Sequence, residues 1–145
     1  MSQPVCAIIG AGEGLGRALA AKFASQKFDI ALISRSEAGS AAAIEAAAAV
    51  TANVRFFSAD ATQPDTIESA LAKVADEMDG TDVLIYNARG EFAACEPLDM
   101  TYAALEDIYR VEVVGAFAAA KTVLPTMIKR SRGSIFFSSA TAAYR

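Results

Sequence analysis

Four glycines follow the first strand-like stretch of the sequence, and they are the strongest chemical signal in it. The apolar run Val5–Ile9 leads directly into glycines at Gly10, Gly12, Gly14 and Gly16. Glycines between a strand and a helix allow a tight turn, let the backbone approach a pyrophosphate, and direct free helix N–H groups at the anion. G-x-G-x-x-G spacing is not met, because Leu15 stands where its last glycine would fall, but G-x-x-x-G-x-G is met. The stretch predicts a nucleotide site, and a flexible surface turn is the alternative.

A second polar group follows the next strand-like run, Phe28–Ile33, which ends at Ser34, Arg35 and Ser36. In a dinucleotide-binding fold this strand end meets the adenosine ribose. A carboxylate there would bind the 2′-hydroxyl of NAD, whereas a guanidinium beside hydroxyls suits the 2′-phosphate of NADP. Ser34 and Arg35 therefore predict that NADP(H) is preferred over NAD(H). An ordinary solvated arginine is the alternative.

Several chemistries are disfavoured by composition. The sequence has no histidine, which excludes Ser-His-Asp and Cys-His catalysis and imidazole-bound zinc. Its two cysteines, Cys6 and Cys95, form no C-x-x-C pair, so no metal site is predicted and a reducing compartment suits them. The net charge is −4, without a basic cluster, so neither nucleic acid nor an anionic membrane is an expected partner.

The elements that must position these groups alternate along the chain. Strands are expected at Val5–Ile9, Phe28–Ile33, Val54–Phe57, Asp82–Tyr86 and Ser134–Ser138. Helices are expected from Leu15, over the alanine-rich residues 37 to 50, after Pro64 with the stripe Ile67, Leu71, Val74 and Met78, and from about Tyr102 to Lys129.

Five strands separated by four helices predict an α/β fold, a doubly wound parallel sheet of the Rossmann type with strand order 3-2-1-4-5. The 145 residues fit one domain, 1–145, without a composition break. Ligands bind such sheets beyond the carboxyl ends of the strands, where the glycines and Arg35 are expected to lie. No basic N-terminal region precedes an apolar segment, and no run of about 18 apolar residues occurs, so a cytoplasmic protein is expected.

The chain resembles the short-chain dehydrogenase/reductase family over its whole length. The resemblance rests on the Gly10/Gly14/Gly16 spacing and on three further landmarks: Asp60-Ala61 after the third strand, Asn87-Ala88 after the fourth, and Val111 with Gly115 in the long helix. It implies that Asp60 and Ala61 contact adenine, that Asn87 and Ala88 line the cofactor cleft, and that Val111 closes the cleft from below. Taken alone, Asp60 is equally typical of a turn cap and Asn87 of a turn residue.

Four positions depart from the family pattern: Ile9, Tyr86, Arg89 and Glu112. The family usually has threonine before its first glycine, an N-N-A-G motif where Tyr86-Asn87-Ala88-Arg89 stands, and a catalytic asparagine at the position of Glu112. Arg89 must swing outward or occupy nicotinamide space. Glu112 is expected either to be buried with a raised pKa or to face a wet cleft.

The family's chemistry uses serine, tyrosine and lysine, with a Y-x-x-x-K element about a dozen residues after the fifth strand. Tyr144 has no lysine four positions on, and Ala140 aligns with the serine. The resemblance therefore implies that the chain is the cofactor-binding part of the family pattern, without the catalytic and substrate segment. Two functions remain open: an NADP-dependent oxidoreductase transferring hydride between nicotinamide and a carbonyl or alcohol, and a non-catalytic NADP(H)-binding or dimerisation module. A homo-oligomer is expected through the fourth helix or the edge of the fifth strand.

Overall fold

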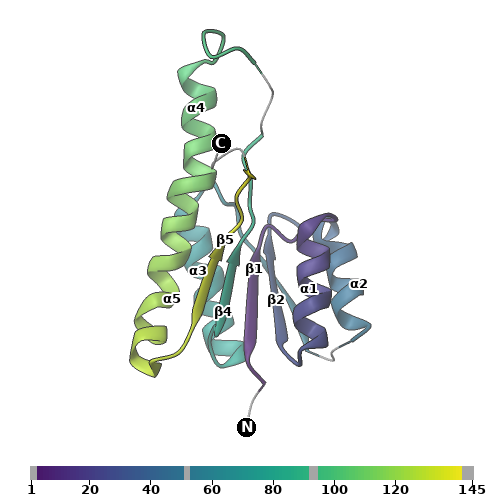
Figure 1. The fold of residues 1–145 in the computed structure, drawn as a ribbon. Coiled ribbons are helices and arrows are strands. Elements are labelled where there is room, and N and C mark those ends of the chain that lie inside the picture. Colours follow the sequence, from purple (N-terminus) through teal and green to yellow (C-terminus); the bar gives the residue numbers. More distant parts are fainter. Residues whose placement is uncertain (1–2, 51–52, 92–94, 142–145) are drawn as a thin grey trace.

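A five-stranded parallel sheet forms the centre of the molecule. The computed structural model describes residues 3–50, 53–91 and 95–141. The strands are β1 (Val5–Ile9), β2 (Asp29–Ser34), β3 (Val54–Ser58), β4 (Val83–Tyr86) and β5 (Ser134–Phe137). They pair in the order β3-β2-β1-β4-β5, with every neighbouring pair parallel (Figure 1). The predicted α/β class and strand order are confirmed.

Helices cover both faces of this sheet. They are α1 (Leu15–Ser25), a 3-10 turn η1 (Ala38–Ser40) leading into α2 (Ala41–Ala48), α3 (Pro64–Met78), and α4 (Tyr102–Tyr109), which continues through the π-helical segment η2 (Arg110–Gly115) into α5 (Ala116–Arg130). In Figure 1, α1 and α2 lie on one side of the sheet and α3 and α5 on the other. Since α4, η2 and α5 form one continuous helix, the predicted four helices are confirmed.

Two apolar cores explain why the strands are hydrophobic on both faces. Cys6 and Ile8 of β1 pack in the cluster shared with α1 and α2, while Val5, Ala7 and Ile9 pack in the cluster shared with α3 and α5. All five residues of β1 are buried. Continuous apolar strands are what a parallel sheet covered on both faces requires.

Some predicted boundaries are wrong by a residue or more. Phe28 lies before β2 and packs edge-to-face on Phe23, with ring centroids 5.2 Å apart. Asp82 precedes β4, where its carboxylate accepts a hydrogen bond from the Val5 N–H. The alanine-rich segment is not one helix, because η1 interrupts it before α2. The start of α3 at Pro64 agrees with the prediction.

The fourth helix is less regular than predicted. It spans Tyr102–Arg130, close to the predicted bounds. The hydroxyl of Thr101, the N-cap residue, accepts a hydrogen bond from the Ala104 N–H at 3.2 Å, and Ser131, in a left-handed conformation, is the C-cap residue. Pro125 lies inside α5, and η2 was not predicted.

By length and composition alone, the helix Tyr102–Arg130 is long and apolar enough to cross a membrane. In the fold, 39% of its most apolar 18-residue stretch is buried. Because core helices of α/β proteins pass the same test, this is weak evidence for a membrane span.

Candidate nucleotide-binding site

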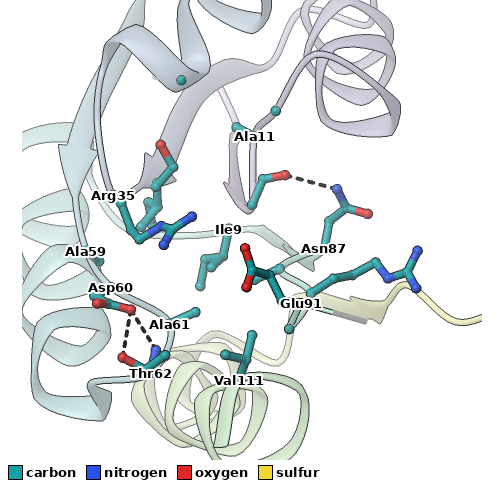
Figure 2. Close-up of a pocket in the computed structure, with 18 of the residues that line it drawn as sticks. Ile9, Ala11, Arg35, Ala59, Asp60, Ala61, Thr62, Asn87, Glu91 and Val111 are labelled. Atoms are coloured by element: carbon teal, nitrogen blue, oxygen red, sulfur yellow. Dashed lines mark hydrogen bonds between the residues drawn. The ribbon is translucent and has the colours of Figure 1, made fainter. Parts of the chain in front are cut away.

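A pocket of about 700 Å³ opens at the carboxyl ends of the central strands, in the range of roughly 300 to 1,000 Å³ usual for ligand sites (Figure 2). It is lined by the ends of β1, β2 and β4, the turn after β3, and the fourth helix. Nine of the residues predicted from sequence line it: Gly10, Gly12, Ser34, Arg35, Asp60, Ala61, Asn87, Ala88 and Val111. The tertiary structure thus brings together groups that lie far apart in the sequence.

The four glycines of the first loop differ in whether the fold itself requires a residue without a Cβ at their position. A Cβ on Gly10, whose φ is +86°, would lie 2.5 Å from the Ala88 nitrogen, and a Cβ on Gly16 would lie 2.7 Å from the Ala11 Cα. Gly10 and Gly16 are therefore required by the packing of the chain itself. Apart from the adjoining backbone, no atom of the residues that the structure describes lies within 4 Å of a Cβ built on Gly12 or Gly14, so these two glycines leave open space. At Gly12 that space belongs to the pocket.

Asn87 joins the glycine loop to the end of β4. Its side-chain amide donates to the Gly10 carbonyl at 2.9 Å (Figure 2). Its backbone N–H donates to the Ile9 carbonyl at 2.7 Å. Asn87 thus has a structural role besides lining the pocket, because it holds the two strand ends at the distance that the pocket requires.

The turn after β2 presents hydroxyls around Arg35. The Ser34 and Ser40 hydroxyls are 2.7 Å apart, and the Ser36 hydroxyl accepts the Gly39 N–H at 3.2 Å. Figure 2 shows the Arg35 side chain extending toward the middle of the pocket. Hydrogen bonds within the turn therefore hold its conformation, and the exposed Arg35 lines the pocket.

Asp60 caps the turn that follows β3. Its Oδ1 accepts hydrogen bonds from the backbone N–H and the hydroxyl of Thr62, both at 2.9 Å (Figure 2). The backbone hydrogen bond from Thr62 is the main cause that lowers the pKa of Asp60; burial opposes it, and the Thr62 hydroxyl and the Arg35 charge add to it. The turn-cap interpretation of Asp60 is confirmed, and the residue lines the pocket as well.

The wall opposite the glycine loop is formed by the fourth helix. The Val111 side chain is 8% exposed and lines the pocket, while its carbonyl accepts a hydrogen bond from the Tyr86 hydroxyl. Burial, followed by the charge of Glu112, raises the pKa of Tyr86 to about 12. Glu112 itself is exposed, so of the two alternatives the buried one is wrong, and Glu112 does not line this pocket either.

Three predicted cofactor residues do not line the pocket: Gly14, Leu15 and Gly16. They form the start of α1, where Leu15 is exposed and Gly16 is buried. Their contribution to binding stays a prediction. Of the catalytic positions, Tyr144 lies outside the described residues, and Ala140 is exposed after β5.

Sequence reasoning missed several lining residues. They are Ala11, Ile33, Gly39, Ala59, Thr62, Gly90, Glu91, Ala104 and Asp107. Ser36 was considered only as a hydroxyl neighbour of Arg35, and Ile9 and Arg89 only as departures from the family pattern. Glu91 extends toward the middle of the pocket from the β4 side (Figure 2). Asp107 comes from α4, and its helical spacing from Val111 was the one signal available for it.

Comparison with known proteins assigns the family. The family model described as short chain dehydrogenase matches residues 4–145. A short-chain dehydrogenase/reductase of Armillaria gallica is 33% identical over 131 residues, which cover 89% of this chain and 50% of that protein. The peroxisomal 2,4-dienoyl-CoA reductase of Danio rerio is 29% identical, over 100% of this chain and 48% of that protein. The chain belongs to the short-chain dehydrogenase/reductase family and spans about half the length of these curated relatives.

Solved structures share the fold. Levodione reductase superimposes with a TM-score of 0.93 at 22% identity, covering 100% of this chain and 57% of that one. A metagenomic short-chain oxidoreductase in complex with NADP gives 0.87 at 24% identity, covering 94% and 61%. An NADH-dependent reductase complexed with NAD gives 0.86 at 22% identity, covering 98% and 61%. Structural neighbours of this chain thus bind nicotinamide dinucleotides of both kinds.

Proposed function

We propose that this chain is the NADP(H)-binding part of an oxidoreductase that transfers hydride between nicotinamide and a carbonyl or alcohol substrate. The observation that carries the proposal is the pocket itself. It combines open space at Gly12 with a cationic Arg35 at the end of the neighbouring strand. This is the arrangement that a phosphorylated dinucleotide requires.

Each part of the pocket suits one part of that ligand. The backbone around Gly12 and the start of α1 would receive the pyrophosphate, and Ser34 with Arg35 the 2′-phosphate. Asp60 and Ala61 would contact adenine, leaving Asn87, Ala88 and Val111 to hold the nicotinamide half. When bound, the nicotinamide supplies or accepts the hydride, while the residues of this chain bind and orient it.

Arg35 provides the test of cofactor preference. A charge-assisted hydrogen bond to phosphate contributes about 1.5 to 3 kcal/mol, and the exposure of Arg35 places the expected value at the lower end. Calorimetric titration should therefore show NADPH binding about tenfold tighter than NADH, since about 1.4 kcal/mol corresponds to a factor of ten. Arg35→Ala should remove this preference and leave the NADH affinity unchanged. Lys73→Ala removes an equal charge from α3, outside the pocket, and is the matched control.

Two results would contradict the NADP assignment. One is equal affinity of the parent chain for NADPH and NADH. The other is an Arg35→Ala variant that keeps the preference of the parent.

A non-catalytic NADP(H)-binding or dimerisation module is the second candidate, and the lining of the pocket favours it. No tyrosine, lysine or histidine is found among the described residues that line the pocket. The carboxyl groups of Glu91 and Asp107 are the acids of the half of the pocket nearest β4 and α4. Steady oxidation of NADPH in the presence of an aldehyde or ketone would favour the oxidoreductase over the non-catalytic module.

The fourth helix supports a proposed homo-oligomer. Exposed apolar side chains recur along one stripe of it at Tyr102, Leu105, Tyr109, Val113, Phe117, Leu124 and Ile128. Phe136 and Phe137 of the edge strand β5 are also about half exposed. Contiguous apolar surface of this kind favours association, and we propose that a second copy of the chain covers it. A cytoplasmic location is proposed from the sequence alone.

A further inference from the structure

The phenol of Tyr86 connects the sheet to the irregular part of the fourth helix. Tyr86 is the last residue of β4 and is 3% exposed. Its hydroxyl donates a hydrogen bond to the backbone carbonyl of Val111, which lies in η2. Val111 therefore accepts this hydrogen bond with its backbone carbonyl, and its side chain forms part of the pocket wall.

A π-helical segment contains more residues per turn than an α-helix. Such segments are rare, occur mostly as single widened turns within α-helices, and are frequent at functional sites. In η2 the widened turn lies directly against the end of β4. A buried carbonyl there needs a donor, and the Tyr86 hydroxyl is that donor for Val111.

The surroundings of the phenol leave little room for another arrangement. A Cβ on Gly115 would collide with the Tyr86 hydroxyl and would lie 2.7 Å from the Ala61 carbonyl oxygen. Gly115 is the last residue of η2, so the widened turn, the phenol and the turn after β3 are packed in direct contact. The glycine admits the hydroxyl to the position from which it reaches Val111.

The widened turn sets which side chains of α4 face the pocket. If it closed to an α-helical turn, the preceding helix would rotate by about 100° and shift by about 1.5 Å for the residue gained. Ala104 and Asp107 would then leave the pocket wall that they now form. The contact of Gly90 with Ile108, where a Cβ would lie 3.0 Å from the Ile108 Cα, would also be lost.

We propose that Tyr86 is a positioning residue, whose hydroxyl holds the fourth helix in the register that forms the wall of the nucleotide pocket. The binding part of this inference rests on the proposed function. The register part does not, because it concerns the conformation of η2 alone.

The experiment compares Tyr86→Phe, which removes the hydroxyl and keeps the ring, with Tyr102→Phe. Tyr102 lies in α4, is 87% exposed, and does not line the pocket, so it controls for the same chemical change. Two quantities are measured: the dissociation constant of NADPH, and the hydrogen-exchange rates of the η2 amides. We expect Tyr86→Phe to weaken NADPH binding about three- to tenfold and to speed exchange in η2 by a similar factor, with Tyr102→Phe unchanged.

Deletion of Val113 supplies a second variant. Val113 lies in η2, is exposed, and does not line the pocket. Its loss removes the extra residue, so the turn can close without changing the register on either side. The deletion combined with Tyr86→Phe is then expected to fold and to bind NADPH within about twofold of the deletion alone, even if Tyr86→Phe by itself does not fold.

Three outcomes would overturn the proposal. They are parental NADPH affinity in a folded Tyr86→Phe variant, unchanged η2 exchange in that variant, and a further loss of NADPH affinity when Tyr86→Phe is added to the deletion. A purely structural role would lower the stability of Tyr86→Phe without changing either of the first two quantities. If the parent chain binds no NADPH, the proposed function fails, and the exchange rates in η2 still decide the role of Tyr86.

Discussion

Replacing Gly12 with alanine should separate the requirements of the ligand from those of the fold. A Cβ at Gly12 would meet no atom within 4 Å among the described residues other than its chain neighbours, and the φ of Gly12 is not positive. The folded chain therefore accommodates the methyl group without strain. Because alanine restricts the unfolded chain more than glycine does, Gly12→Ala should raise the free energy of unfolding by about 0.4 to 1 kcal/mol.

The same methyl group should weaken cofactor binding. It projects into the open space where we propose that the dinucleotide backbone passes close to the loop. Inserting a methyl group into a well-packed contact costs about 1 to 3 kcal/mol, which corresponds to about a 5- to 100-fold loss of NADPH affinity. The change in stability and the change in affinity thus have opposite signs.

Gly10→Ala is the matched comparison from the same loop. Its Cβ would lie 2.5 Å from the Ala88 nitrogen, and its φ of +86° disfavours any residue with a Cβ. The conformation costs about 1 to 2 kcal/mol, and the collision adds about 1 to 3 kcal/mol, so this variant should lose stability.

Urea unfolding followed by circular dichroism gives the stabilities, and calorimetric titration with NADPH gives the affinities. The reasoning is refuted if Gly12→Ala binds NADPH as tightly as the parent. It is equally refuted if Gly12→Ala is destabilised as much as Gly10→Ala, since the space at Gly12 would then not be open.

Three further predictions concern other parts of the chain. Arg89→Gly should bind NADPH more tightly than the parent, because a long cationic side chain stands where the family has a glycine beside the cofactor; unchanged affinity in the titration would show that Arg89 points away. The 145-residue chain should show no NADPH-dependent carbonyl reduction and should self-associate in light scattering; a stable monomer, or turnover that mutation of Glu112 or Tyr144 abolishes, would contradict this. The stability of the parent should fall between about pH 10 and pH 12, because the folded state keeps Tyr86 protonated to about 12 while the unfolded chain releases that proton near 10. Two pH units at about 1.4 kcal/mol each give about 3 kcal/mol, and Tyr86→Phe should lack this component in alkaline urea titrations.

The fold class and the place of the site could be predicted from the sequence because both depend on local patterns. Apolar runs such as Val5–Ile9 and the stripe of α3 specify strands and helices by their periodicity. The carboxyl ends of parallel strands meet at one edge, so Gly10, Gly12, Arg35 and Asn87 had to converge there once the order of the elements was known.

Tertiary structure alone decided the individual roles at that edge. Gly10 and Gly12 are equivalent in a motif, yet Gly10 is constrained by the backbone of Asn87 and Ala88, and Asn87 lies 77 positions away in the sequence, whereas Gly12 faces open space. Residue spacing gives no sign of the widened turn η2, because this turn depends on a hydrogen bond from the phenol of Tyr86, which lies in strand β4. Such contacts join groups that are distant in the sequence, and their geometry is set by the packing of whole elements, which no local pattern encodes.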